Sequence, residues 1–184
     1  NAGSARCFLK MNGDDTGDNI SDLAKYFSEL SVQYWAWKNV DADYYGLCHY
    51  RRYLSFSDKR YKNTVFNMVR ELKLTPHEKK KYHLDDTKKI EKTVKQYDMI
   101  IPVVAKASEM SYNRAEVKTL REMWESYNGV YFEQGIIDKM FSLIKEYSPE
   151  YYNSACEYFS GKYHRAFNCY IMKKELFVRM CEFQ

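Results

Sequence analysis

Aromatic and apolar residues recur at helical spacing near the start of the chain, after a polar stretch rich in Asp and Gly. The spacing predicts a helix over residues 22–39, with Ser21 as its N-cap and Asp22 in its first turn. A short apolar run then predicts a strand over residues 44–48. The apolar face of this helix consists of Leu23, Tyr26, Phe27, Leu30, Tyr34 and Trp37, of which Leu23, Phe27, Leu30 and Tyr34 are predicted to be buried.

Helical and strand-like patterns alternate through the rest of the chain. Apolar runs of strand type cover residues 98–104 and 166–172, Asp86 is suited to cap a helix, and Pro149 fits the first turn of another. The alternation predicts an α/β or α+β fold in which helices flank a small sheet. Because no Pro- or Gly-rich linker divides the chain, we predict one domain over residues 1–184. The predicted helices cover residues 63–72, 86–97, 114–127, 132–147, 149–159 and 173–183.

The charge of the chain limits its partners. A net charge of +4 and a pI near 8.6 favour phosphorylated ligands but fall short of the basic surface typical of nucleic-acid-binding proteins. Lysines are densest in residues 73–96, where acidic residues interrupt them, which is typical of a solvated helix. Although the segment 50–53 (YRRY) combines cations with rings that could stack on bases, we predict no nucleic-acid partner.

Cysteine content and hydropathy bear on cellular location. Five cysteines form an odd set without CxxC spacing, so neither a disulfide framework nor a zinc ribbon is predicted, and a reducing cytosol is the simplest location. No stretch approaches the roughly 20 apolar residues of a membrane-spanning helix. We predict a cytoplasmic protein, leave open a position at the inner face of the membrane, and expect membrane association to be peripheral or through partners.

The stretch GLCHYRRYL, residues 46–54, places His49, Tyr50, Arg51 and Arg52 directly after the predicted strand. Strands of open α/β sheets present ligand-binding residues at their carboxyl ends. The guanidinium of Arg binds phosphate through two parallel hydrogen bonds, and His or Tyr can donate a further one. The four residues are therefore candidates for binding an anion.

A structural role for the same stretch stays open. If the motif continues the strand, Cys48 and Tyr50 face one side of the sheet while His49 and Arg51 face the other, so that half of the motif is directed at a core. The two arginines would then neutralise nearby carboxylates, with Asp43 or Glu29 as the partners.

Five segments of the chain follow the order of motifs in one known family. The resemblance is to the DUF4422 family, and it is densest over residues 14–54. The family is placed among the glycosyltransferases of bacterial capsule and exopolysaccharide clusters. The resemblance therefore implies a GT-A-like, Rossmann-like α/β fold that transfers a sugar from a nucleotide-diphosphate donor to a growing surface or capsular polysaccharide. The segments are DDTGDNIS (14–21), ELSVQYWAWKN (29–39), YYGLCHYRRYL (44–54), YDMIIPV (97–103) and FNCYIMKKELF (167–177).

The resemblance also implies partners and site residues. The donor is a nucleotide sugar and the acceptor a glycan or a lipid-linked glycan. His49, Tyr50, Arg51 and Arg52 are assigned to the donor diphosphate, and no catalytic residue is identified. The residues assigned to the sugar or the nucleotide are Gly17, Asp18, Asn19, Trp37, Lys38 and Asn168.

Two of these assignments have structural alternatives. Asp18 is a candidate for orienting a sugar hydroxyl, but it equally fits a turn after Gly17. Tyr34, Trp35 and Trp37 more often complete the apolar face of a helix than stack on a sugar. The turn at residues 17–19 also leads into the predicted helix, whose free N–H groups could bind an anion.

The family pattern further predicts elements outside this sequence. Its members begin with a strand that carries a histidine-lysine motif and end with a tryptophan-bearing helix, and neither is found in the 184 residues. We therefore expect a glycosyltransferase-like domain without the first strand and the last helix. A catalytically silent carbohydrate-binding or assembly module of the same fold is the alternative function.

Metal dependence is the last prediction from the sequence. GT-A enzymes commonly hold Mn or Mg against the donor phosphates with an Asp-any-Asp motif, and Asp41 and Asp43 have that spacing. These two residues precede the predicted strand, whereas the motif normally follows one. We predict no required cofactor, because the arginines can supply the positive charge, and keep a divalent metal at Asp41 and Asp43 as an alternative.

Overall fold

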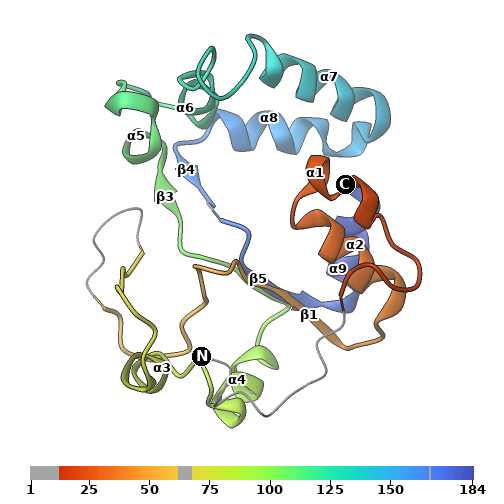
Figure 1. Ribbon diagram of the computed structural model, residues 1–184. Coiled ribbons are helices and arrows are strands. Elements are labelled where there is room, and N and C mark those ends of the chain that lie inside the picture. The colour runs from red at the N-terminus through yellow and green to blue at the C-terminus, as the bar shows by residue number, and fades with distance from the viewer. Residues whose placement is uncertain (1–12, 62–67, 166) are drawn as a thin grey trace. The chain divides into compact units, whose positions relative to one another are not determined.

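The computed structural model describes residues 13–61, 68–165 and 167–184 of the chain (Figure 1). The chain divides into two compact units, each described by itself. Unit 1 comprises residues 1–47 and 171–184, and unit 2 comprises residues 48–170. None of the helices in the described ranges is both long enough and apolar enough to span a membrane.

Unit 1 contains two helices that lie side by side, α2 and α9 (Figure 1). A neighbouring pair of strands, β1 and β5, belongs to one small sheet. A 3-10 turn and a one-turn helix, α1, precede α2. In chain order the elements are the 3-10 turn Ser21–Leu23, α1 (Ala24–Phe27), α2 (Leu30–Asn39), β1 (Tyr44–Leu47), β5 (Tyr170–Lys173) and α9 (Lys174–Phe183).

The single helix predicted over residues 22–39 is wrong. Ser28 adopts a left-handed conformation with φ of 48°, which separates α1 from α2. Its carbonyl accepts a hydrogen bond from the Ser31 hydroxyl at 3.0 Å, and that hydroxyl also donates to Asp14 Oδ2 at 2.6 Å. Ser21 does not cap through its side chain, so the predicted N-cap is wrong as well.

The burial predicted for this segment is only partly right. Leu23 and Phe27 are each 42% exposed, so the prediction is wrong for both residues. Leu30 and Tyr34 are half-buried. The fully buried residues of α2 are instead Ser31 and Gln33, because the break at residue 28 turns a different face of the helix inward.

The core of unit 1 forms around an aromatic stack. The ring of Phe177 on α9 is 2% exposed and lies parallel to the Tyr45 ring of β1, with centroids 4.1 Å apart. The Tyr45 hydroxyl donates to the Val40 carbonyl at 2.6 Å, which satisfies its polar end. Buried Gln33 reaches Cys181 and Gln184 at the end of α9. The core thus joins α2, β1 and α9.

Unit 2 contains short strands and six helices within the described ranges, with the longest helices at α7 and α8 (Figure 1). Strands β3 and β4 pair in antiparallel register, with Ala105 opposite His164. Ala107, Leu120 and Met123 form its buried cluster. The elements are α3 (Pro76–Lys81), α4 (Thr87–Val94), β2 (Met99–Ile100), β3 (Ala105–Lys106), α5 (Ala107–Met110), a 3-10 turn (Tyr112–Arg114), α6 (Leu120–Glu125), α7 (Ile136–Tyr147), a 3-10 turn (Pro149–Tyr151), α8 (Tyr152–Ser160) and β4 (Tyr163–His164).

These elements test the remaining sequence predictions. The prediction of a mixed α/β fold with small sheets flanked by helices is confirmed. The predicted cap of α4 is also confirmed, since the Asp86 side chain accepts a hydrogen bond from the Lys89 N–H. The helix predicted over 63–72 is wrong for residues 68–72, which are not helical, and its other residues lie outside the described ranges. The strand predicted over 98–104 shortens to β2, and the one over 166–172 becomes β5 at 170–173.

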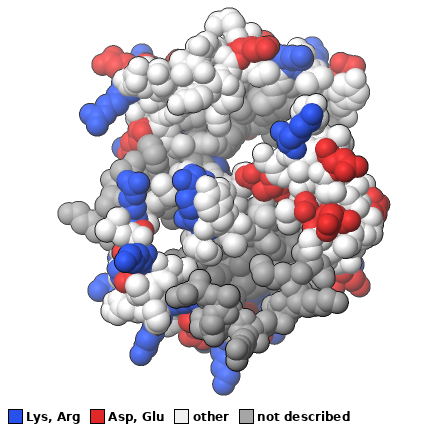
Figure 2. All heavy atoms as spheres, in the orientation of Figure 1, with Lys and Arg blue, Asp and Glu red and all other residues white. Residues whose placement is uncertain are grey.

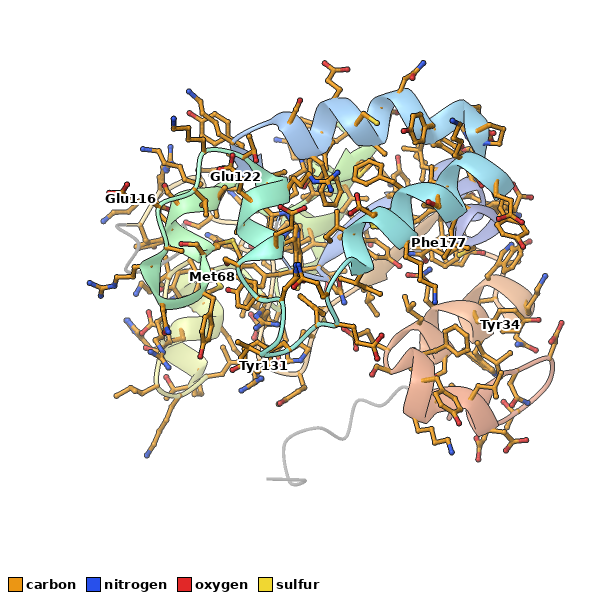
Figure 3. The ribbon with its side chains drawn as sticks, turned by 90° about the horizontal axis from the view of Figure 1, so that it is seen from above. Tyr34, Met68, Glu116, Glu122, Tyr131 and Phe177 are labelled. Carbon is orange, nitrogen blue, oxygen red and sulfur yellow. The ribbon has the colours of Figure 1, made fainter. Side chains whose placement is uncertain are left out.

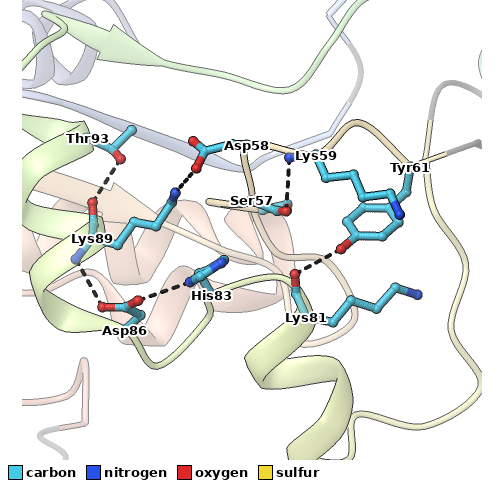
Figure 4. Close-up of polar contacts among 10 residues, drawn as sticks. Ser57, Asp58, Lys59, Tyr61, Lys81, His83, Asp86, Lys89 and Thr93 are labelled. Carbon is cyan, nitrogen blue, oxygen red and sulfur yellow. Dashed lines mark hydrogen bonds and ion pairs between the residues drawn. The ribbon is translucent and has the colours of Figure 1, made fainter.

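A polar network fixes the segment that follows the HYRR motif (Figure 4). Lys89 of α4 forms an ion pair with Asp58, and His83 contacts Asp86 at 3.0 Å. The Tyr61 hydroxyl donates to the Lys81 carbonyl at 3.3 Å. Residues 58–61 are therefore tied to α3 and α4, which limits the freedom of the chain on the C-terminal side of the motif.

His164 gives unit 2 a predicted dependence on pH. Its Nδ1 lies 3.0 Å from the Tyr158 hydroxyl, which itself accepts from the Arg165 N–H at 3.1 Å. This arrangement suits a neutral imidazole that accepts at Nδ1. Burial accordingly lowers the pKa of His164 from its usual 6.5.

Because the pKa of His164 is lower in the folded than in the unfolded state, the unfolded state takes up more protons as the pH falls. Above pH 6.5, the pKa of His164 in the unfolded state, we expect the neutral side chain to contribute fully to the stability of the protein. Below that pH the contribution should be lost progressively. Melting temperatures measured across this range should fall less in His164→Gln than in the wild type. His77→Gln, an exposed substitution on α3, should melt with the wild-type pH profile. Parallel profiles for all three proteins would contradict the prediction.

Candidate active site

The HYRR motif forms a tight turn. The Arg52 N–H donates to the His49 carbonyl at 3.0 Å, and the two residues form an antiparallel bridge. β1 ends earlier, at Leu47. The expectation that Cys48 to Arg51 continue the strand with alternating faces is therefore wrong, because the backbone reverses direction at Tyr50 and Arg51.

The turn places two tilted polar rings side by side and exposes Tyr50 and Arg51 to solvent. The His49 and Tyr50 rings lie 4.1 Å apart, and the Arg51 guanidinium lies 4.8 Å from the Tyr50 ring, which is 75% exposed. The Arg51 N–H donates to His49 Nδ1 at 3.2 Å. In a neutral imidazole the proton then sits on Nε2, which can donate to a ligand.

Neither Arg51 nor Arg52 forms an ion pair with any residue that the structure describes. Asp43 and Glu29, the partners in the structural alternative, belong to unit 1, so that alternative stays open. A guanidinium without a carboxylate partner keeps its donors available for an anion. The turn thus carries positive charge that no ion pair among the described residues neutralises.

The segment around Asn168 meets this turn within unit 2. The Arg52 guanidinium lies 4.5 Å from the Phe167 ring, and the Cys169 thiol contacts the Arg52 carbonyl at 3.5 Å. Both chain neighbours of Asn168 thus contact Arg52. Phe167 has φ of 81°, which is costly for a side chain of this size and occurs mainly at ligand sites and tight turns. The structure therefore brings together two predicted site segments that are far apart in the sequence.

The Cys48 thiol lies beside this turn. Although the residue is exposed, partial desolvation first, and the nearby Cys169 second, raise the pKa of its thiol above the usual 9.0. A protonated thiol is a weak nucleophile. The candidate chemistry of the turn therefore comes from Arg51, Arg52 and His49.

In unit 1, the DDTGDNIS segment lies against α2. Asn39 is the main contact: its Oδ1 accepts from the Asp18 N–H at 3.1 Å, and its Nδ2 donates to the Asp18 carbonyl at 2.7 Å and to the Trp35 carbonyl at 2.9 Å. The Trp35 indole N–H donates to the Thr16 carbonyl at 2.8 Å. The sequence analysis missed Asn39 as a positioning residue, although it ends the YWAWKN motif.

These contacts define the roles of the predicted residues 17–19. Gly17 has φ of +60°, and a Cβ there would lie 2.0 Å from Asn39 Oδ1, so only glycine fits. The Asp18 carboxylate accepts from the Tyr34 hydroxyl at 3.1 Å, and the Asn19 side chain accepts from the Ser21 N–H at 3.2 Å. Desolvation, followed by the Asp18 carboxylate, raises the pKa of Tyr34.

The anion site predicted at the start of this helix is wrong. α1 has 4 residues, too few for an appreciable dipole, and the Asn19 side chain already occupies the Ser21 N–H. Carboxylates also surround the turn. Figure 2 shows red acidic side chains gathered over the elements of unit 1, where Asp15, Asp18 and Asp22 are exposed. Residues 17–19 suit hydroxyl groups better than phosphates.

Lys38 and Trp37, also predicted as binding residues, contact each other. The Lys38 ammonium lies 3.4 Å from the Trp37 ring centre and 5.5 Å from that of Tyr34. Trp37 is half-buried and Lys38 is exposed. The aromatic residues of this motif thus belong partly to the α2 surface and partly to its packing, as the structural alternative predicts.

The Asp41-Ala42-Asp43 segment connects α2 to β1 and contacts the start of α9. Lys174 Nζ donates to Asp41 Oδ1 at 2.5 Å, and the Lys174 N–H donates to the Asp43 carbonyl at 2.9 Å. The ion pair lowers the pKa of Asp41 and raises that of Lys174. One of the two carboxylates proposed as metal ligands is therefore engaged with a cation. Within the described ranges, no group of three or more His, Cys, Asp or Glu side chains could hold a metal ion.

The described elements form a mixed α/β fold in which helices flank small sheets. A solved structure titled as the apo form of WbbM, a bifunctional glycosyltransferase, matches 92% of this chain with a TM-score of 0.80 and 28% sequence identity. This chain covers 29% of that protein's length. The family DUF4422, described as a domain of unknown function, matches residues 1–184, and the chain belongs to this family. No curated protein sequence matches it.

The HYRR turn belongs to unit 2, whereas the turn at residues 17–19 belongs to unit 1. Their convergence on one donor, with Arg51 or Arg52 near the 17–19 turn, stays a prediction.

Proposed function

We propose that this chain is a GT-A-like glycosyltransferase that transfers a sugar from a nucleotide-diphosphate donor to a glycan or lipid-linked glycan. The Arg52 arrangement carries the proposal. The guanidinium of half-buried Arg52 lies over the Phe167 ring, and the Arg52 carbonyl accepts from the Cys169 thiol. Phe167 and Cys169 flank Asn168, the residue assigned to the donor sugar. The likeness to a glycosyltransferase and the family membership support the same function.

The proposed chemistry follows from the charges at the turn. During transfer, the bond between the anomeric carbon and the diphosphate oxygen breaks. The acceptor hydroxyl oxygen bonds to that carbon and releases its proton. Negative charge builds on the leaving diphosphate, and fixed donors that face this charge lower the barrier. Arg51, Arg52 and His49 Nε2 would supply those donors, and the 17–19 turn would hold sugar or nucleotide hydroxyls.

Three further parts complete the proposal. A capsular or other surface polysaccharide is the proposed product. A cytoplasmic location is proposed, as for enzymes that use nucleotide sugars made in the cytoplasm. We propose no required cofactor, because the arginines supply positive charge where other transferases use a divalent metal.

Calorimetric titration of UDP and GDP into wild type and Arg52 variants tests this function. Arg52→Lys keeps the cation over Phe167 but removes the two-pronged donor, so nucleotide affinity should fall while the melting temperature changes little. Arg52→Ala should weaken binding by about 1.5–3 kcal/mol, as expected for a lost charged hydrogen bond. Arg60→Ala, an exposed substitution later in the chain, should bind as the wild type does.

Two outcomes would count against the proposal. If folded wild type binds neither nucleotide, with or without added manganese, the silent carbohydrate-binding module becomes the better function. If the Arg52 variants lose binding only in proportion to a lowered melting temperature, the arginine has a structural role. Titration in the presence of a chelator tests the proposed absence of a metal requirement.

A further inference from the structure

A segment with exposed apolar side chains leads into α3 in unit 2. Residues 69–74 form neither a helix nor a strand, and they follow half-buried Met68, which is labelled in Figure 3. Leu72 is 98% exposed, Leu74 44% and Val69 39%. A single exposed leucine is ordinary on a protein surface, but several exposed apolar side chains in one short segment indicate a surface that meets a partner.

Contacts with α3 hold this segment in place. The Glu71 carboxylate accepts from Lys81 Nζ at 2.7 Å and from the hydroxyl of buried Tyr82. Directly after the segment, the Thr75 N–H donates to the Glu78 carboxylate at 3.2 Å, which fixes the start of α3. The backbone is therefore tied to α3 on both sides of the exposed leucine at position 72.

The charge around the segment is positive. Over residues 68–82 five Lys and Arg side chains oppose two Glu side chains, a net charge of +3. Four of these cations are exposed, and none of the four forms an ion pair with any residue that the structure describes: Arg70, Lys73, Lys79 and Lys80. The contact between Glu71 and Lys81 brings the lysines in the last turn of α3 beside the segment.

Exposed leucines among unpaired cations fit the surface of an anionic bilayer. Apolar side chains enter the boundary between headgroups and acyl chains, while Lys and Arg are attracted to the negative surface, and stable attachment usually needs both contributions. A surface that binds single-stranded nucleic acid combines cations with stacking rings instead, and residues 69–74 contain no aromatic side chain.

We propose that residues 69–74 and the last turn of α3 dock on an anionic phospholipid bilayer. Leu72 enters the interfacial region, and the four exposed cations lie against the lipid phosphates. Docking would hold the chain at the surface where a lipid-linked glycan acceptor lies. That role rests on the proposed function, whereas lipid binding does not depend on it.

The test is co-sedimentation of the chain with vesicles made of equal parts phosphatidylglycerol and phosphatidylcholine. Wild type should bind these vesicles, bind them less in high salt, and leave vesicles of phosphatidylcholine alone unbound. Lys79→Gln with Lys80→Gln should weaken binding about 25-fold, since each cation near an anionic surface contributes roughly fivefold. Leu72→Asn should weaken binding about 10-fold, because an apolar side chain no longer leaves water.

Matched controls come from α7, in the same unit. Lys139→Gln with Lys145→Gln removes the same charge from exposed positions, and Leu143→Asn changes a leucine that is 45% exposed. These controls should bind the anionic vesicles nearly as the wild type does. All the variants should keep the wild-type melting temperature, because the changed side chains lie at the surface.

Three results would overturn the proposal. They are no sedimentation of folded wild type with the anionic vesicles, equal losses in the α3 and α7 lysine variants, and unchanged binding in Leu72→Asn. The last result would leave a surface that acts through charge alone, which suits a nucleic acid or an acidic protein. Titration of UDP and GDP into the same variants separates this inference from the proposed function, since the docking variants should bind nucleotide as the wild type does. Lipid binding without nucleotide binding would support the docking surface and overturn the transferase.

Discussion

Phe177→Ala is expected to lower the free energy of unfolding by about 3–5 kcal/mol, the usual cost of truncating a buried Phe. The ring is 2% exposed and stacks on Tyr45 at 4.1 Å. Its removal leaves a cavity between α9 and β1 and also removes the stacking energy. Urea titration followed by circular dichroism would measure the loss.

Phe27→Ala is the matched control in the same unit. The sequence pattern predicts a core position for Phe27, but the ring is 42% exposed, so truncation should cost under about 1 kcal/mol. Hydrogen exchange should locate the Phe177→Ala effect in α2 and α9. Equal costs for the two variants would show that the core of unit 1 is wrongly assigned.

The contrast between Phe27 and Phe177 shows what sequence periodicity can and cannot predict. Periodicity predicted helical structure around both residues, since each segment has apolar residues at helical spacing, but it merged α1 and α2 into one helix. It could not find the break at Ser28, because no glycine or proline marks it and the left-handed turn depends on the Ser31 hydroxyl and Asp14. Once α1 and α2 are separate helices, the predicted apolar face no longer points in one direction.

The HYRR turn was misread for a related reason. Turns are usually recognised by Gly, Pro, Asn or Asp, and none of these occurs in residues 48–54. Anion binding by the motif stays a prediction, because it rests on the Arg and His side chains at the end of a strand and not on where the turn begins. Its contact with Phe167 and Cys169 was not predictable from periodicity, since 115 residues separate Arg52 from Phe167.

Gly17→Ala is expected to destabilise the protein by about 2–4 kcal/mol, combining the cost of a left-handed alanine with two lost hydrogen bonds. The new Cβ would lie 2.0 Å from Asn39 Oδ1. Asn39 cannot easily move aside, because its amide contacts both the N–H and the carbonyl of Asp18 as well as the Trp35 carbonyl. The loop must therefore leave α2 or strain the helix end.

A double-mutant cycle separates the two causes. In an Asn39→Ala background the steric conflict is gone, so Gly17→Ala should cost only the backbone term of about 1–2 kcal/mol. Gly129→Ala is the matched control, because that glycine also has positive φ but its added Cβ would meet nothing within 4 Å. Gly129→Ala should therefore lower the free energy of unfolding only by the cost of the left-handed backbone. If Gly17→Ala costs the same with and without Asn39, the two motifs are not coupled through this contact. If the costs differ as expected, the GDN and YWAWKN motifs form one structural unit, in which Asn39 fixes the backbone at Asp18.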